Sequence, residues 1–232
     1  MTGHIDAMAK DDVREQLVAA GVQLMLAGGF TATGIKEIVD TADVPKGSFY
    51  YYFPSKEAFA EAVVAKYSGD AVKLRMDTLS NGAVAPLDRL RASFEAFLPY
   101  YASKGFMEGC LLGNLGVDAA DRSDLVRGSL QSAFKAWQTD LHALLAEADL
   151  AGDLPRGLDP AMTAAFLVNS WEGALVRMKV ERSDEPLRCF FTIFDHLIMG
   201  QRPKSPIKTG RSKRGRSKRG RRKTEVPRAA AD

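Results

Sequence analysis

Two short predicted helices with a tight connection between them constrain this 232-residue chain more than any other feature. Thr33 is expected to cap the first of them, because the apolar residues that follow it share one helical face. Pro45 suits the first turn of a helix and predicts the second one, which reaches Tyr52. The four residues 41–44 between them give the spacing of a helix-turn-helix, whose second helix enters the major groove of DNA.

The second predicted helix carries side chains that suit a phosphate backbone. Its phenols and hydroxyls can bond phosphate oxygens, Lys46 can neutralise charge, and Gly47 lets the backbone come close. Phe49 and Phe53 are four residues apart and should face inward. The alternative is a plain helical hairpin whose tyrosines only pack. The candidate DNA contacts on this helix are Lys46, Gly47, Ser48, Tyr50, Tyr51 and Tyr52.

The rest of the chain up to residue 200 also favours helices, and no alternating β pattern competes with them. Gly28 and Gly29 are expected to end the first helix, and Ser55 to cap the one after the predicted pair. Residues 86–103 predict one helix with a bend at Pro99. The predicted fold class is all-α.

This pattern divides the chain into three parts. Residues 1–54 are predicted to form a three-helix DNA-binding domain, and residues 55–200 a larger helical domain. Residues 201–232 contain a repeated five-residue unit of Gly, Ser, Lys and Arg with no apolar side chain to bury. We therefore expect a basic C-terminal tail that is disordered when unbound.

The charges are divided unevenly along the chain. Residues 201–232 hold 13 Lys or Arg against two acids, whereas the first 200 residues hold 19 basic residues against 27 acids. An acidic globule with a basic tail indicates a polyanionic partner. Residues 1–70 hold only six basic side chains against ten acids, so we expect the tail to supply charge for binding nucleic acid. The alternatives are an inert extension and a general nucleic-acid anchor.

Residues 29–57 resemble the DNA-binding domain of the TetR family of transcriptional regulators. The resemblance implies that Thr33 and Lys56 contact phosphates, while the candidates on the second helix lie at the groove. Tyr52 and Gly34 depart from the residues usual in the family, which leaves the operator sequence open. The matching residues are Gly29, Phe30, Thr31, Thr33, Ile38, Ala42, Val44, Lys46, Gly47, Ser48, Phe49, Tyr50, Phe53, Ser55, Lys56 and Glu57.

Residues 105–118 and 169–183 resemble a narrower subgroup, the repressors of the N-ethylmaleimide-reductase type and the acrylate-responsive regulators. The resemblance makes Cys110 a candidate sensor of a small effector or a reactive electrophile. A thiol reacts as its thiolate, and a helix start together with Arg177 or Lys179 would lower its pKa. The alternative is that Cys110 is a small apolar core residue.

The remaining effector-site candidates are aromatic or polar side chains of the body. The preferred residues beside Cys110 are Tyr100, Asn114, Trp171 and Lys179, and the further candidates are Tyr101, Phe106, Trp137 and Glu172. Aromatic side chains at helical spacing are more often core residues than ligand walls. A cavity with a few convergent polar groups is what a small-molecule effector would need.

The last two predicted helices carry more apolar surface than one layer of the chain can cover. The resemblance implies that they pair across a two-fold axis, so the expected partners are a second copy, an operator in double-stranded DNA and a small effector. The expected interface residues are Phe166, Ser170, Ala174, Phe190 and Phe194. The resemblance also implies repression, with activation as the alternative.

Other function classes receive little support from the sequence. No glycine-rich phosphate loop and no cluster of metal ligands stands out, so we expect neither a cofactor nor a metal. A cysteine-dependent enzyme would need a base for Cys110, and none of the three histidines forms a pattern with it. A nucleoid-type protein that binds DNA through the tail alone is the other alternative. Two cysteines and no apparent export signal or membrane span indicate a cytoplasmic protein.

Overall fold

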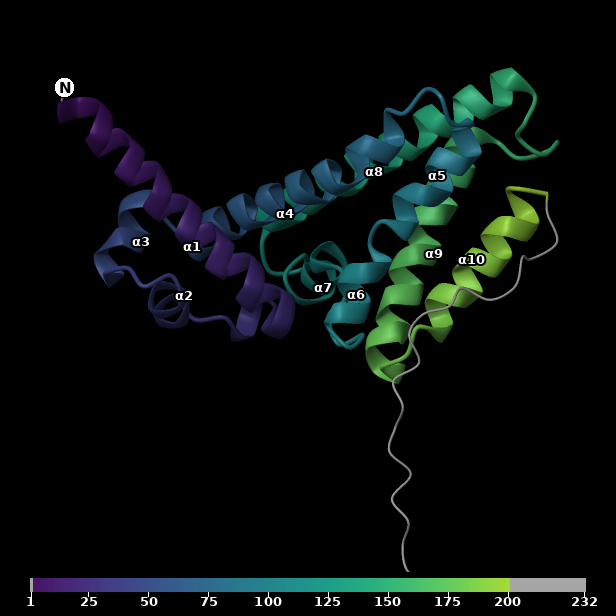
Figure 1. The fold of residues 1–232 in the computed structure, drawn as a ribbon. Helices are drawn as coiled ribbons and strands as arrows, with labels where there is room; N and C mark the ends of the chain where they lie inside the picture. The colour runs from purple at the N-terminus through teal and green to yellow at the C-terminus, as the bar shows by residue number, and fades with distance from the viewer. Residues whose placement is uncertain (1, 201–232) are drawn as a thin grey trace, which may run out of the picture.

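The computed structural model describes residues 2–200, with side chains from Asp12 onward, and every regular element in this range is a helix (Figure 1). The all-α prediction is confirmed. The predicted basic tail lies outside the described residues. The helices are α1 (Thr2–Ala32), α2 (Ile35–Thr41), α3 (Lys46–Tyr52), α4 (Lys56–Leu79), α5 (Pro86–Glu95), α6 (Leu98–Ser103), α7 (Leu111–Asp118), α8 (Asp124–Ala151), α9 (Pro160–Glu181) and α10 (Glu185–Leu197).

The head of the molecule, which we define as α1 to α3, is built around a cluster of phenylalanines. Phe49 on α3 is fully buried, and its ring centroid lies 5.7 Å from that of Phe53 and 5.1 Å from that of Phe59 on α4. Ser55 caps α4 as expected, since its hydroxyl accepts a hydrogen bond from the backbone N–H of Ala58 at 3.1 Å. This core fixes α3 against α4 and orients the outer face of α3.

Helix α1 is interrupted at Gly29, close to where the sequence predicts its end. Gly29 has φ 81° and ψ 178°, a left-handed φ that glycine adopts without steric cost, and helical geometry resumes after it as far as Ala32. The kink displaces the last residues of α1 from the main helix axis. It brings Thr31 against α7, which belongs to the body.

The body, α4 to α10, is a bundle in which α8 packs against α4, α5 and α9, while α10 packs on α9 (Figure 1). Its centre is aromatic: the ring centroids of Phe94 and Phe190 each lie 5.0–5.1 Å from that of Trp171. The helix predicted over residues 86–103 is divided into α5 and α6 just before Pro99. No helix within residues 2–200 is both long and apolar enough to cross a membrane.

Candidate functional site

Helix α3 presents one face to the core and the opposite face to solvent. Phe49 holds the helix in place, whereas the side chains of Tyr50 and Tyr51 are 57% and 67% exposed and Lys46 is also exposed. Ser48 and Tyr52 are half-buried, and Pro45 lies at the N-cap, one position before the first turn in which the sequence placed it. The expected inward position of Phe49 and Phe53 is confirmed.

The two residues expected to bind phosphates are placed differently. The Thr33 side chain is buried and its hydroxyl donates to the carbonyl of Gly29 at 2.7 Å, while Gly34 occupies the N-cap of α2. The expectation that Thr33 caps α2 is therefore wrong, while its contact with a phosphate stays a prediction. Lys56 is half-buried at the start of α4, with its ammonium 4.4 Å from the centroid of the Phe30 ring.

A partly open cavity of about 50 Å³ lies in the body between α4, α6, α7, α8 and α9, and we call it the inner cavity. Trp171, Trp137 and Tyr101 line it, as does Cys110. The α4 wall of this cavity was not predicted from the sequence, and it includes Tyr67, Ser68 and Arg75. Their spacing of i, i+1 and i+8 puts them on one side of the helix. An arginine on this side of the helix was the sequence signal that could have indicated a polar cavity wall.

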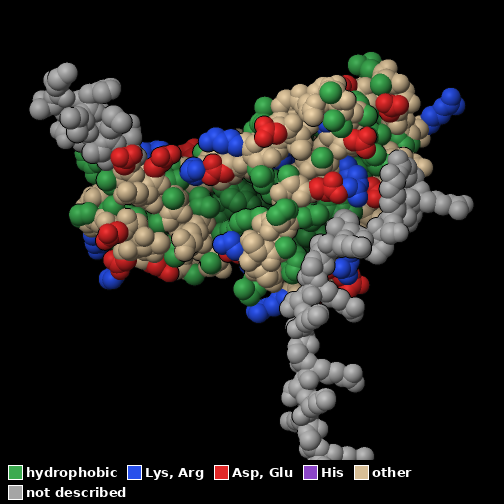
Figure 2. Space-filling view, viewed as in Figure 1, with side chains coloured by type: hydrophobic (Ala, Val, Ile, Leu, Met, Phe, Trp, Pro, Cys, Tyr) green, Lys and Arg blue, Asp and Glu red, His purple; other side chains and the backbone are tan. Residues whose placement is uncertain are grey.

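A second hollow, the junction cleft, lies between the end of α1, α7 and α9, and has a volume of about 360 Å³. Asn114, Glu172, Lys179 and Cys110 line it. The side-chain amide of Asn114 donates to the carbonyl of Leu26 at 3.2 Å, which ties α7 to the head. Figure 2 shows hydrophobic side chains gathered in a hollow near the middle of the visible face.

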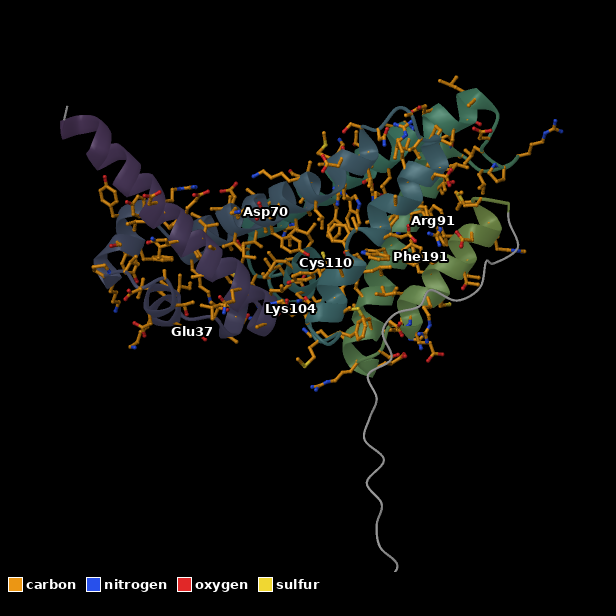
Figure 3. All side chains as sticks on the ribbon, in the orientation of Figure 1. Glu37, Asp70, Arg91, Lys104, Cys110 and Phe191 are labelled. Carbon is orange, nitrogen blue, oxygen red and sulfur yellow. The ribbon has the colours of Figure 1, made fainter. Side chains whose placement is uncertain are left out.

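Cys110 lines both hollows, and it is labelled near the centre of the molecule in Figure 3. Burial raises the pKa of its thiol, the neighbouring Glu172 carboxylate raises it further, and a hydrogen bond from the backbone of Gly113 only partly opposes these effects. Burial also raises the pKa of Glu172 to about 7. The expected lowering of the Cys110 pKa is therefore wrong, and Arg177 instead bonds Glu181 on the exposed side of α9.

Most of the other effector-site candidates of the body line one of the two hollows, and Tyr100 is an exception. Trp171 and Tyr101 line the inner cavity, while Asn114 and Lys179 line the junction cleft, so the sequence selected residues of both hollows. Tyr100 lines neither, because its hydroxyl donates to Glu108 at the surface. The place of Tyr100 at the effector site stays a prediction that neither hollow supports.

A groove with an apolar floor runs between α9 and α10. Its exposed rim includes Phe166, Ile193 and Leu197, whose side chains are 51%, 44% and 48% exposed. Three of the expected interface residues, Ala174, Phe190 and Phe194, line this groove but are buried within the chain, so they form its floor. Ser170 is half-buried in the same groove.

Comparisons with known proteins cover both halves of the described chain. A family described as "Bacterial regulatory proteins, tetR family" matches residues 17–63, and one described as "Tetracyclin repressor-like, C-terminal domain" matches residues 86–194. The chain is 38% identical to the HTH-type transcriptional repressor DhaR of Mycobacterium sp. (strain GP1), over 80% of this chain and 92% of DhaR.

Two further comparisons agree with these matches. The transcriptional regulator AcuR of Cereibacter sphaeroides is 36% identical over 78% of this chain and 82% of its own length. The crystal structure of the reduced form of NemR from E. coli superposes with a TM-score of 0.71 at 33% identity, over 80% of this chain and 97% of NemR. With matches in both the head and the body, the chain belongs to the TetR family of bacterial transcriptional regulators.

Proposed function

We propose that the protein is a transcriptional repressor that binds a palindromic operator as a homodimer through α3. A small molecule that binds in the body would release it from the DNA. The observation that carries this proposal is the outer face of α3, where Lys46, Tyr50 and Tyr51 project from a helix held by the buried Phe49. Lysine and phenol side chains at that position suit phosphate and base-edge contacts in the major groove. Gly47, Ser48, Tyr52 and Lys56 are the flanking contacts that we propose.

The two proposed roles are divided at the domain boundary that the sequence predicts. We assign DNA binding to residues 1–54, and effector binding and dimerisation to residues 55–200. The α9–α10 groove supports the dimer, because its apolar floor and exposed Phe166, Ile193 and Leu197 offer a surface that a second copy can cover. A two-fold dimer would direct two heads toward successive major grooves, whose centres are about 34 Å apart.

Helix α7 is the element that we propose connects the effector to the head. Cys110 stands at the N-cap of α7 and lines the inner cavity, while Asp118, the last residue of α7, accepts hydrogen bonds from Thr31. A ligand that shifts the start of this eight-residue helix would change the contact at its other end. Release follows if the ligand binds more tightly to the head arrangement that does not fit the operator.

The proposal is tested by selecting DNA from a random double-stranded pool with the full-length protein and mapping the protected bases. We expect a protected palindrome, and weaker binding by about tenfold for Lys46→Ala. Lys135→Ala removes an exposed lysine from α8, far along the chain from the head, and should leave the affinity unchanged. Protection without any common sequence would instead support nucleoid-type binding through the basic tail, and would overturn the proposal.

Sensing of a reactive electrophile at Cys110 is the second candidate for the signal, because an electrophile inside the inner cavity would meet this thiol. Its raised pKa favours reversible, non-covalent binding over this candidate. A cysteine-dependent enzyme receives less support. His142 and His196 are the two histidines within the described side chains, and both are exposed and line neither hollow.

A further inference from the structure

The described part of the chain ends at Gly200, and its last helix, α10, leads away from the head. In Figure 1 the head lies at one end of the molecule, and the C-terminal end of α10 lies at the opposite end. Helix α3, which we propose contacts the operator, belongs to the head. The basic tail, residues 201–232, is therefore attached to the body on the side that faces away from α3.

The tail has the composition of a segment that binds nucleic acid. Residues 211–223 contain nine Lys or Arg and neither an acid nor an apolar side chain. Each phosphate that such a cation neutralises releases a counterion, and this favours binding to DNA of any sequence. We propose that the basic tail binds a second DNA duplex, which the dimer thereby joins to the operator held by its heads. The inference rests on the proposed function, which supplies the first duplex, and adds the bridging of two DNA segments to it.

The length of the tail favours a second duplex over the operator. Helix α4 runs from the head into the body and has 24 residues, so it is about 36 Å long. The end of α10 lies farther from the head than the end of α4 does (Figure 1). Ser217, the centre of residues 211–223, comes 17 residues after Gly200. A chain of that length without fixed structure, as the sequence predicts, spans roughly 20–25 Å. Its cations should therefore stay nearer to the far end of the body than to the operator.

The proposed dimer brings two tails together. Leu197 and Ile198, at the end of α10, line the α9–α10 groove through which we propose the two copies pair. A two-fold interface uses the same surface of both copies, so both tails begin beside it. Their charges then act on the same DNA segment, which doubles the number of phosphates that the pair can neutralise.

The last acid before the tail is already occupied by another residue of the body. Asp195 on α10 accepts two hydrogen bonds from the guanidinium of Arg91 on α5, at 2.6 and 3.2 Å. Arg91 is labelled beside α10 in Figure 3. Because this ion pair neutralises the carboxylate, Asp195 should compete little with DNA phosphates for the cations of the tail.

The two DNA contacts should differ in their dependence on salt. In the head, Lys36 is paired with Asp40 at 2.6 Å, whereas Lys46 is exposed. Lys56 is half-buried against the ring of Phe30. The head thus neutralises few phosphates, and the logarithm of its operator affinity should fall against the logarithm of salt with a slope of roughly −2 to −3 per subunit. Nine cations in the tail predict a slope of up to about −8 for the second duplex.

The experiment measures whether the full-length protein holds two duplexes at once. The selected operator is attached to beads, and a labelled duplex of unrelated sequence and equal length is added with the protein. We expect the beads to retain the labelled duplex. A tail variant of the full-length chain should lower this retention by about tenfold or more, while the operator affinity changes by less than about threefold. Its nine substitutions are Arg211→Gln, Lys213→Gln, Arg214→Gln, Arg216→Gln, Lys218→Gln, Arg219→Gln, Arg221→Gln, Arg222→Gln and Lys223→Gln.

Two further variants are the controls. Replacement of the six arginines of residues 211–223 by lysine keeps the charge and should keep the retention within about threefold of wild type. Lys46→Ala should lower retention on operator beads by about tenfold, because it weakens the contact of the head. It should leave the binding of the unrelated duplex in solution unchanged, since that contact belongs to the tail.

Several outcomes would overturn the inference. They are no retention by the wild type, equal retention by the tail variant, and equal retention by Lys46→Ala, which would show two tails joining the duplexes without the heads. A loss of operator affinity of about tenfold or more in the tail variant would instead place the tail on the operator. Preferential retention of a labelled RNA of equal length would overturn the assignment to DNA. A protected palindrome without retention refutes only this inference, whereas binding of the unrelated duplex without any protected palindrome refutes the proposed function.

Discussion

The carboxylate of Asp118, at the end of α7, accepts two hydrogen bonds from Thr31, at the end of α1. The backbone N–H and the hydroxyl of Thr31 each lie 2.7 Å from one of its oxygens. These bonds hold the pKa of Asp118 below its usual value, because they stabilise the charged form. The residues are 87 positions apart in sequence, and their contact joins the head to the body.

Replacement of Asp118 by Asn should weaken this junction. An amide nitrogen cannot accept a hydrogen bond, so one of the two Thr31 donors loses its partner. We expect the free energy of unfolding to fall by about 1 kcal/mol, measured by denaturant titration near neutral pH. Asp121→Asn is the matched control, since Asp121 is exposed three residues further on, and it should leave stability unchanged.

The wild type and Asp118→Asn should also differ in how their free energies of unfolding depend on pH. A carboxyl group whose pKa is lower in the folded state stabilises that state above its ordinary pKa of 3.8, and the contribution is lost as the pH falls through the folded-state value. The stability difference between wild type and Asp118→Asn should therefore be constant from pH 7 to about 5 and should shrink below pH 4. A difference that grows on acidification would contradict the assigned bonds.

Gly29 and Gly28 should respond in opposite ways to alanine. Gly29 has a left-handed φ of 81°, and a Cβ there would lie 2.8 Å from an Asp118 carboxylate oxygen. We expect Gly29→Ala to lower the free energy of unfolding by about 2 kcal/mol, through backbone strain and displacement of Asp118. A Cβ on Gly28 would meet only the Cβ of Ala32 at 3.9 Å. Gly28→Ala should therefore raise the free energy of unfolding by about 0.5–1 kcal/mol. Thermal denaturation of both variants checks the contrast.

Cys110 should react slowly with iodoacetamide in the folded protein. Its raised pKa leaves less thiolate at pH 7 than an ordinary thiol has, so the rate should keep rising with pH beyond the ordinary value of 9.0. The measurement uses a Cys189→Ser background, which leaves Cys110 as the single thiol, and the same protein in denaturant as the reference. If poor access alone slowed the reaction, the rate would stop rising once the pH exceeds the ordinary pKa of 9.0. A rate that levels off there or at lower pH would contradict the raised pKa.

The head was predictable because its signals are local. Pro45 at the start of α3, Ser55 at the cap of α4 and the spacing of Phe49 and Phe53 each act within one or two helical turns. Thr33 was assigned incorrectly for a related reason. Its residue type suits a cap, but the turn at Gly29 offers a carbonyl to its hydroxyl, and this competing contact is not visible in the spacing.

The body was predictable only in part, because its hollows are formed by residues far apart in sequence. Trp171 and Asn114, which were predicted at the effector site, each line one of the two hollows. Arg75 and Ser68 line the inner cavity and were not predicted, because they lie on a helix that looks like a plain connection. The pKa of the Cys110 thiol depends on burial and on Glu172, which is 62 positions away in the sequence. A helix start and nearby basic residues would lower the pKa of the thiol and so suggested a reactive cysteine. Burial in the assembled bundle raises this pKa, and its effect is the larger one.

Disruption of the α9–α10 groove tests the dimer independently of DNA and ligand. Ile193→Glu places a charge on the rim of the groove, where a second copy would have to bury it, and we expect a monomer by light scattering. Leu150→Glu is the control, because Leu150 is 90% exposed at the far end of α8 and does not line the groove. The control should remain a dimer with wild-type operator affinity. Ile193→Glu should keep its helical content and lose most of that affinity, since one head contacts only half of a palindrome. A dimer that survives Ile193→Glu would place the two-fold interface on another surface.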